Sequence, residues 1–302
     1  MVNMVSTNSI WAKVQRRLLF AFARYLPDRW YLERLFPLMV GYSLNLDHPM
    51  TFNEKLQWLK LYDRKPEYSK MVDKIEAKKY VAAIIGEEHI IPTLAVYDSV
   101  EDIVFDDLPE QFVLKCSHDS GTGLVICKDK ETLDKGAVLR KLKKALKINY
   151  FFRNREWPYK SLKPRILAEA YIEDGHDREL RDYKFFCFNG KPQRMLLATG
   201  RNDMERGLCL DFFDMDFNHL DLADEGHSNA KSIPHKPLHF DEMKQLAVKL
   251  SAGIPQVRVD FYEANNVVLF GELTFFDMGG YRRIRPNSWD LEWGKMIKLP
   301  TI

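Results

Sequence analysis

The chain has 302 residues, enough for two domains of ordinary size or for one large α/β unit. Hydrophobic residues make up 46% and charged residues 29%, and the 15 Gly and 14 Pro do not cluster, which excludes collagen-like, low-complexity and wholly disordered proteins. The 45 Lys and Arg nearly balance the 43 Asp and Glu, and a formal net charge of +2 argues against a dedicated nucleic-acid-binding protein. We therefore expect small-molecule partners.

Charge is distributed unevenly along this balanced chain. Six basic and two acidic side chains lie in residues 1–40, and five basic and two acidic side chains lie in residues 281–302, which leaves −5 for the middle. Both ends favour an anionic surface or polymer, whereas the middle supplies the carboxylates that metal chemistry needs.

Cysteine usage and hydropathy indicate the compartment. The cysteines Cys116, Cys127, Cys187 and Cys209 are far apart and form no CxxC pair. Their spacing therefore predicts no zinc site and no disulfide framework. No apolar run approaches the roughly 20 residues that span a bilayer, and the N-terminus lacks the pattern of a secretion signal. We expect a cytoplasmic protein.

The first predicted element is a basic amphipathic helix over residues 11–26, which ends before Pro27 and carries Arg16, Arg17 and Arg24. Such a helix packs on the body of a protein or lies on an anionic membrane. Peripheral contact with the inner face of a membrane is therefore one expectation for this segment.

Further helices and short strands follow in chain order. Thr51 and Glu54 form a capping-box pattern that opens a helix over 55–62, and a second helix is predicted over 69–85, ending at Gly86. Asn189-Gly190 predicts a tight hairpin. The remaining predicted elements are helices at 132–148 and 240–251 and strands at 90–97, 112–116, 124–128, 165–171, 183–188, 192–199, 256–262 and 267–274.

A strand followed by a glycine loop is typical of phosphate binding. Lys115 at the strand end supplies a point charge, and the loop of Ser120, Gly121, Thr122 and Gly123 lets backbone N–H groups approach an anion. The spacing is neither that of a Walker A loop nor that of a Rossmann fingerprint, so an ordinary glycine hairpin is equally compatible. His118 precedes this loop and could contact phosphate or acceptor.

Two carboxylates fall on the last pair of predicted strands. Asp260 and Glu272 would lie on neighbouring antiparallel strands, where carboxylate oxygens together with nucleotide phosphates are the ligands expected for Mg²⁺. The alternative is a structural ion pair between Asp260 and Arg258. The strand at 182–190 adds Lys184, which could reach phosphate, and the preceding acids could bond ribose hydroxyls.

Five motifs together resemble the TupA-like ATP-grasp family: TFNEKLQWLK at 51–60, FVLK at 112–115, DYKFFCFNGKP at 182–192, VRVD at 257–260 and GELT at 271–274. The family is associated with bacterial surface polysaccharides such as capsule, and its name refers to teichuronopeptide, in which acidic polymers carry amide-linked amino acids. The resemblance implies an α+β ATP-grasp fold, in which two α+β subdomains with antiparallel sheets grip ATP and Mg²⁺. It also implies carboxylate–amine ligation through an acylphosphate.

The resemblance also implies roles for individual residues. Lys115 and Lys184 would contact the phosphates and serve catalysis, and Asp260 and Glu272 would hold Mg²⁺. The implied nucleotide-binding residues are Lys78 (or Lys74), Lys115, Ser120, Gly121, Thr122, Gly123, Glu169, Tyr171, Ile172, Glu179, Asp182 and Lys184. Within this set, Glu169, Tyr171 and Ile172 would frame adenine, and Glu179 or Asp182 would contact the ribose.

The chain departs from the family pattern at two positions. Thr274 stands where many ATP-grasp enzymes have Asn, and the loop at 275–285 reads FFDMGGYRRIR where relatives read Pro-Gly-Ser-Gly. Arg282 and Arg283, with Arg285, could clamp a uronic-acid or phosphate-bearing acceptor and serve catalysis. A solvated basic tail is the alternative.

These expectations combine into one function and several alternatives. The leading expectation is an ADP-forming ligase that joins an amino acid or other amine to an anionic, uronic-acid-containing saccharide. A sugar or polymer kinase, a glycosyltransferase using Asp214 and Asp216, and a non-catalytic nucleotide-binding assembly protein are the alternatives. The expected divisions are an N-terminal helical segment (1–50), the first subdomains with the glycine loop (51–165) and a C-terminal subdomain with the metal carboxylates (166–302).

Overall fold

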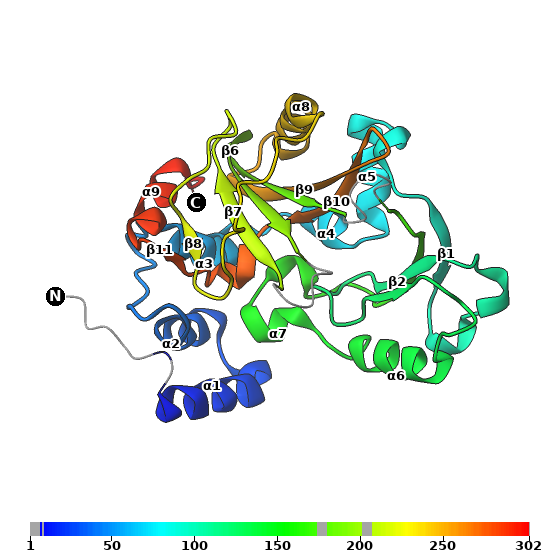
Figure 1. Ribbon diagram of the computed structural model, residues 1–302. Coiled ribbons are helices and arrows are strands. Elements are labelled where there is room, and N and C mark those ends of the chain that lie inside the picture. Colours follow the sequence, from blue (N-terminus) through cyan, green and yellow to red (C-terminus); the bar gives the residue numbers. More distant parts are fainter. Residues whose placement is uncertain (1–6, 8, 174–179, 201–206, 302) are drawn as a thin grey trace.

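Two antiparallel sheets form the centre of the computed structural model, which describes residues 7, 9–173, 180–200 and 207–301 (Figure 1). The four-stranded sheet has the order β1 (Thr93–Tyr97), β4 (Ile166–Ala170), β2 (Phe112–Cys116) and β3 (Val125–Cys127). The five-stranded sheet has the order β10 (Val267–Thr274), β9 (Gln256–Ala264), β5 (Asp182–Phe188), β6 (Lys191–Thr199) and β7 (Cys209–Phe213). A short pair joins β8 (Ala223–Asp224) to β11 (Ile284–Arg285).

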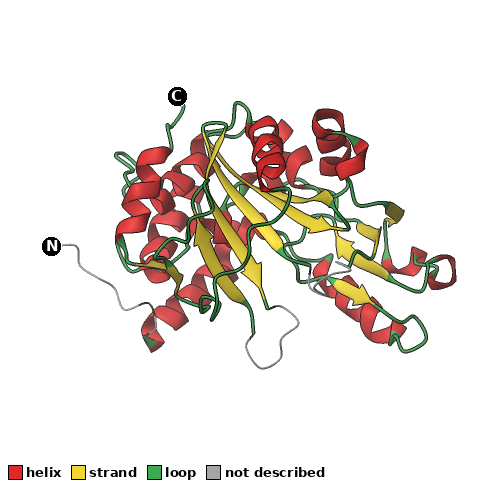
Figure 2. Cartoon of the chain, turned by 45° about the horizontal axis from the view of Figure 1, so that its top comes forward, coloured by secondary structure: helices red, strands yellow, loops and turns green. Residues whose placement is uncertain are grey.

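Helices surround both sheets, and in Figure 2 the strands of the large sheet cross the middle of the molecule with helices on the outside. The helices are α1 (Ile10–Phe22), α2 (Asp28–Val40), α3 (Phe52–Tyr62), α4 (Glu67–Val72), α5 (Glu76–Ile85), α6 (Lys135–Ala145), α7 (Tyr150–Asn154), α8 (Phe240–Ser251) and α9 (Ser288–Met296). Single 3₁₀ turns occur at Ala23–Tyr25, Glu87–His89, Val100–Asp102, Phe105–Asp107, Trp157–Tyr159 and Asp277–Gly280. Among the residues that the structure describes, no helix is long and apolar enough to cross a bilayer.

Three apolar clusters hold the elements together. The largest joins the five-stranded sheet to α3, α4, α5, α8 and α9, the second joins the four-stranded sheet to α6, and the third joins α1 to α2. The division of the chain between the two sheets differs from the expected domain boundaries at two places. Strand β4 begins after residue 165 but belongs to the four-stranded sheet, and α3 to α5 lie before that boundary but pack on the five-stranded sheet.

Most predicted elements occur near their expected bounds, because capping and turn residues mark them. The Thr51–Glu54 capping box is formed in full, and Asn189 and Gly190 take positive φ values of 49° and 79° in the β5–β6 hairpin. Asn265 and Asn266 also have positive φ, which allows β9 and β10 to continue to a two-residue turn.

The continuous helix predicted over 69–85 is wrong. Asp73 leaves helical geometry, and its carboxylate accepts the N–H groups of Ile75 (2.9 Å) and Glu76 (3.1 Å), which starts a new helix. The break between α4 and α5 places Lys74 outside either helix. The sequence patterns did not predict four further elements, namely the helices α2, α7 and α9 and the strand β7.

Candidate functional site

The register of the large sheet places three charged side chains in one cross-strand row. Lys184 on β5 lies opposite Asp260 on β9, which lies opposite Glu272 on β10. The Lys184 ammonium donates to Asp260 Oδ2 and to Asp182 Oδ2, both at 2.6 Å. The predicted metal carboxylates and the predicted phosphate lysine are therefore neighbours.

Arg258 connects this row to a third carboxylate. Its Nε and Nη2 donate to the two carboxylate oxygens of Asp260 at 2.7 Å each, and the same Nη2 lies 2.9 Å from Glu272 Oε1. Its Nη1 contacts Asp277, which is fully buried. The alternative prediction of an Arg258–Asp260 ion pair is therefore confirmed alongside the cross-strand pair.

The donor set at Asp260 and Glu272 fits Mg²⁺. One guanidinium nitrogen contacts both carboxylates, so a single cation can bridge them, and carboxylate oxygens are the ligands that Mg²⁺ prefers. Among the described ranges no group of three or more His, Cys, Asp or Glu side chains could hold a metal ion. Two carboxylates would leave the other ligand positions to water and phosphate oxygens. Thr274 Oγ1 donates to Glu272 Oε1 at 3.1 Å and orients this carboxylate.

The charges around the row keep two carboxylates ionised. Burial alone would raise the pKa of Glu272, but the charges of Lys74 and Arg258 outweigh it and lower the pKa to about 2. For Asp277, Arg282 and Arg258 outweigh burial in the same way and lower the pKa to about 2. Burial raises the pKa of Asp260, against the opposing charges of Arg258 and Lys184.

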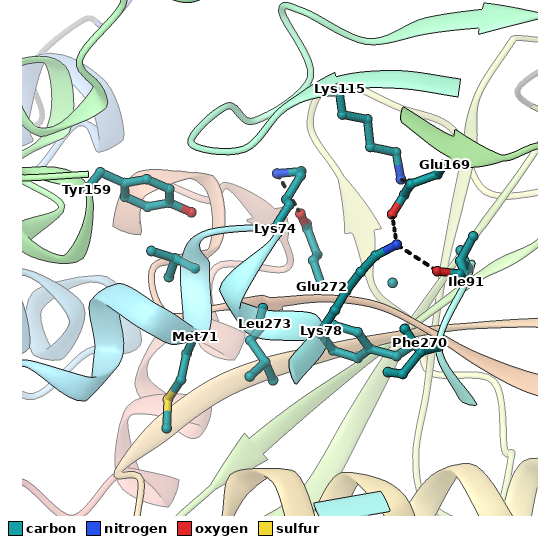
Figure 3. Close-up of a pocket in the computed structure, with 14 residues that line it drawn as sticks. Met71, Lys74, Lys78, Ile91, Lys115, Tyr159, Glu169, Phe270, Glu272 and Leu273 are labelled. Atoms are coloured by element: carbon teal, nitrogen blue, oxygen red, sulfur yellow. Dashed lines mark hydrogen bonds and ion pairs between the residues drawn. The ribbon is translucent and has the colours of Figure 1, made fainter. Parts of the chain in front are cut away.

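A second charged cluster faces the row from the four-stranded sheet (Figure 3). Glu169 on β4 is only 4% exposed, and its two oxygens lie 2.7 Å from Lys78 Nζ and 2.5 Å from Lys115 Nζ. Lys78 also donates to the Ile91 carbonyl at 2.6 Å. Glu169, predicted with Tyr171 and Ile172 at the adenine edge, lines the same apolar pocket as these two residues, and its carboxylate also binds the two lysines.

Glu272 of the row and the Glu169 cluster line a cleft, which adjoins an apolar pocket. Lys74, Lys78, Lys115, Glu169 and Glu272 line the cleft together with Tyr159, Phe270 and Gly271. The pocket is lined by Val113, Leu124, Ile126, Tyr171, Ile172, Leu180 and Tyr262, and it shares Ile91, Lys115 and Glu169 with the cleft. An apolar pocket beside a cluster of ammonium groups suits a planar base attached to a polyanion. Glu179 lies outside the described residues.

Lys74 and Lys78, the two alternatives for one basic contact, both line the cleft. Lys74 Nζ lies 3.9 Å from Glu272 Oε2 and also donates to the Asp119 carbonyl. It therefore links Glu272 to the residue that precedes the glycine loop. Lys78 faces Glu169 instead. The sequence offered these lysines as alternatives, but the break at Asp73 turns both toward the same space.

The glycine loop differs from the expected open phosphate cradle. Asp119 accepts the backbone N–H of Thr122 at 3.0 Å and that of Gly123, so these donors already have a partner, and residues 120–123 do not line the cleft. His118 is buried, its Nε2 lies 3.0 Å from the Ile148 carbonyl, and burial lowers its pKa. The structure therefore places His118 away from the cleft.

The arginines of the 275–285 loop divide into two kinds. Arg282 is buried and pairs with Asp277 and, at 2.7 Å, with Asp224 Oδ2, so it braces the site and does not present a free fork to an acceptor. Arg283 is half-buried, pairs with Glu225 and donates to Thr7 Oγ1 at 2.9 Å. Arg285 is exposed.

A polar stripe on α3 was missed by sequence reasoning. Asn53, Gln57 and Lys60 are buried, and they donate to the carbonyls of Arg282 (2.9 Å), Gly280 (2.7 Å) and Gly279 (2.6 Å), respectively. The stripe thus fixes the loop that carries Asp277. The available signal was the spacing of three polar residues at i, i+4 and i+7 inside the TFNEKLQWLK motif.

Comparisons with known proteins find several solved structures that are similar to this chain. Among solved structures, the D-alanine–D-alanine ligase of Bacillus anthracis is 17% identical with a TM-score of 0.39, over 68% of this chain and 57% of that one. The Helicobacter pylori D-alanine–D-alanine ligase is 16% identical with a TM-score of 0.41, over 86% and 74%. D-cycloserine synthetase DcsG is 11% identical with a TM-score of 0.39, over 75% and 70%.

The chain thus spans less than two thirds of the length of the first of these ligases. A search of curated proteins finds no match. The family model described as TupA-like ATPgrasp matches residues 54–298, which is most of the chain. The fold is accordingly the ATP-grasp fold, as the sequence motifs indicated, and the chain belongs to the TupA-like ATP-grasp family.

Proposed function

We propose that the protein is an ATP- and Mg²⁺-dependent carboxylate–amine ligase. The observation that carries this proposal is the cavity with Lys78 and Lys115 on one side and Glu272 on the other, next to an apolar pocket of suitable character for a purine. Family membership supports ATP as the nucleotide. Both sheets would contact one nucleotide bound across this cavity.

The chemistry would proceed in two displacements. A carboxylate oxygen of the first substrate attacks the γ-phosphorus of ATP and ADP leaves, and the amine of the second substrate then attacks the acyl carbon. Inorganic phosphate leaves and the nitrogen loses a proton. Mg²⁺ bound by Asp260 and Glu272 would neutralise charge on the phosphates.

The chain's own residues would supply binding and orientation. Lys78, Lys115 and Lys184 are cations already fixed by carboxylates, so they can contact phosphate oxygens without first being ordered. Tyr171 and Ile172 would contact the base, and Asp182 beside Lys184 remains the candidate for the ribose. The glycine loop would reach the phosphates only after Asp119 releases its N–H groups.

We further propose an anionic, uronic-acid-containing saccharide as the carboxylate substrate and an amino acid as the amine. A groove lined by Tyr42, Glu225, Arg283 and Asn287 lies beside the 275–285 loop and supports this choice. Arg283 and Arg285 remain the acceptor candidates, and Arg282 is assigned to positioning. Replacing Arg283 and Arg285 with Gln should raise KM for the saccharide and leave KM for ATP unchanged.

The direct test incubates purified protein with ATP, Mg²⁺ and panels of uronic acids and amino acids while ADP and product mass are followed together. ADP with an amide product supports the proposal. ADP with a phosphorylated sugar would make the protein a kinase, and consumption of a nucleotide sugar without ADP would make it a glycosyltransferase. Asp214 already bonds the backbone N–H groups of Asp216 (2.9 Å) and Asn218 (2.8 Å), which indicates a structural turn there.

Two conservative variants test the metal carboxylates. Asp260→Asn and Glu272→Gln should each lower turnover by roughly a hundredfold or more, because each removes a hard anionic ligand while keeping the shape. Asp216→Asn is the matched control, since this exposed aspartate should have no effect on ligation. Full activity in both Asp260→Asn and Glu272→Gln would contradict the assigned metal site.

A further inference from the structure

Helix α1 has two apolar faces, and only one of them is buried in the protein. Ala12 and Leu19 pack in the apolar cluster with α2. On the other face Trp11, Leu18 and Phe22 are 77%, 54% and 57% exposed, and their spacing of seven and four residues places them on one side of the helix. We call this side the α1 face; it consists of Ile10, Trp11, Val14, Leu18 and Phe22.

The α1 face continues into a groove against the neighbouring helix. Leu18 and Phe22 line this groove together with Leu26, Trp30 and Pro37. In Figure 1, α1 is at the edge of the molecule, with α2 between it and the sheets. The apolar surface therefore lies on the outside of the protein and away from the nucleotide cleft.

Basic side chains flank the α1 face. Lys13, Arg17, Arg24 and Arg34 are exposed, and none of them forms an ion pair within the part of the chain that the structure describes. The Arg34 guanidinium lies over the Trp30 ring, 5.5 Å from its centroid. Residues 9–40 contain six basic and two acidic side chains, so this exposed apolar surface carries a net positive charge.

We propose that the α1 face docks on an anionic lipid surface. Aromatic and aliphatic side chains beside Lys and Arg match the acyl boundary and the negative headgroups of such a surface. A second copy of the chain fits less well, because docking two α1 faces would bring two positive surfaces together. The proposal does not depend on the ligase chemistry.

The test is co-sedimentation of the full chain with vesicles of phosphatidylcholine alone and of equimolar phosphatidylcholine and phosphatidylglycerol. The protein should sediment with the anionic vesicles only, and added salt should release it. The double variant Trp11→Gln with Phe22→Gln should weaken partitioning by about tenfold or more. Lys13→Gln with Arg17→Gln should weaken it by about fivefold per residue.

Leu238→Gln is the matched control, because Leu238 is also an exposed apolar residue, 83% exposed, but lies far along the chain from α1. Thermal unfolding and the stabilisation by ATP should be unchanged in all variants, which separates a lost surface from a lost fold. Equal binding to neutral vesicles, no binding to either, or equal loss in the Leu238→Gln control would overturn the proposal. Self-association that the Trp11→Gln/Phe22→Gln variant abolishes, without vesicle binding, would assign the face to a dimer instead.

Discussion

Arg258→Gln should destabilise the protein and make its stability depend more strongly on Mg²⁺ than that of the wild type. Arg258 is buried and donates to Asp260, Glu272 and Asp277, so the substitution leaves three carboxylates without their shared cation. Breaking a buried ion pair costs about 3–5 kcal/mol. Each carboxylate keeps one other cation, so we expect a loss near about 3 kcal/mol, which corresponds to a fall in Tm of roughly 6–12 °C.

Scanning calorimetry with a chelator and with MgCl₂ measures both effects. A divalent cation can take the place of the guanidinium between Asp260 and Glu272, and at ten times its Kd it would restore about 1.4 kcal/mol. Arg29→Gln is the control, since this surface arginine pairs with Glu33 and Asp47, and its loss should change Tm little and show no Mg²⁺ dependence. Equal Mg²⁺ effects on wild type and Arg258→Gln would refute the reasoning.

Three further outcomes follow from buried contacts. Lys60→Met should cost roughly 2–5 kcal/mol, measured by urea unfolding, because two carbonyls lose their donor, whereas Lys79→Met on the surface should be neutral. The pKa of Asp277, about 2 against an ordinary 3.8, means that its ion pairs stabilise the fold fully above about pH 4 and less as pH falls toward about 2. The stability gap between wild type and Asp277→Asn should therefore narrow by about 2 kcal/mol over that interval, and a constant gap would disprove the assignment. Gly123→Ala should lower Tm by overpacking worth about 1–3 kcal/mol, since a Cβ there would lie 2.7 Å from Cys116 Sγ; an unchanged Tm would show that the loop moves freely.

The hairpins of the large sheet could be predicted from the sequence because turn residues mark them. The turns at Asn189-Gly190 and Asn265-Asn266 start two hairpins, but each ladder then shifts by one residue, and the shift at Gly271 brings Asp260 opposite Glu272. Without this shift Glu272 would lie opposite Val259, and its side chain would be on the other face of the sheet from Asp260. Turn chemistry therefore predicts that Asp260 and Glu272 lie on neighbouring strands, whereas their direct pairing depends on a bulge that the turn does not indicate.

Contacts between distant segments could not be predicted in this way. Lys78, Lys115 and Glu169 come from a helix and two strands, and nothing in their local patterns indicates that one carboxylate binds both lysines. The break at Asp73 was equally hidden, because the apolar period of a helix continues across it. A side-chain cap can interrupt a helix without changing hydrophobic periodicity.

The polar stripe on α3 connects the TFNEKLQWLK motif at 51–60 to the candidate site. Asn53, Gln57 and Lys60 donate to three backbone carbonyls within residues 279–282, and this loop in turn holds Asp277 against Arg258. Burying an ammonium group lowers its pKa, as it does for Lys60, so such a residue is retained only where several acceptors converge. The consequence is a chain of contacts from α3 to Arg258, which lies between Asp260 and Glu272. A substitution in α3, distant from the cleft, should therefore alter Mg²⁺ dependence as well as stability, which a helix that only packed on the sheet would not do.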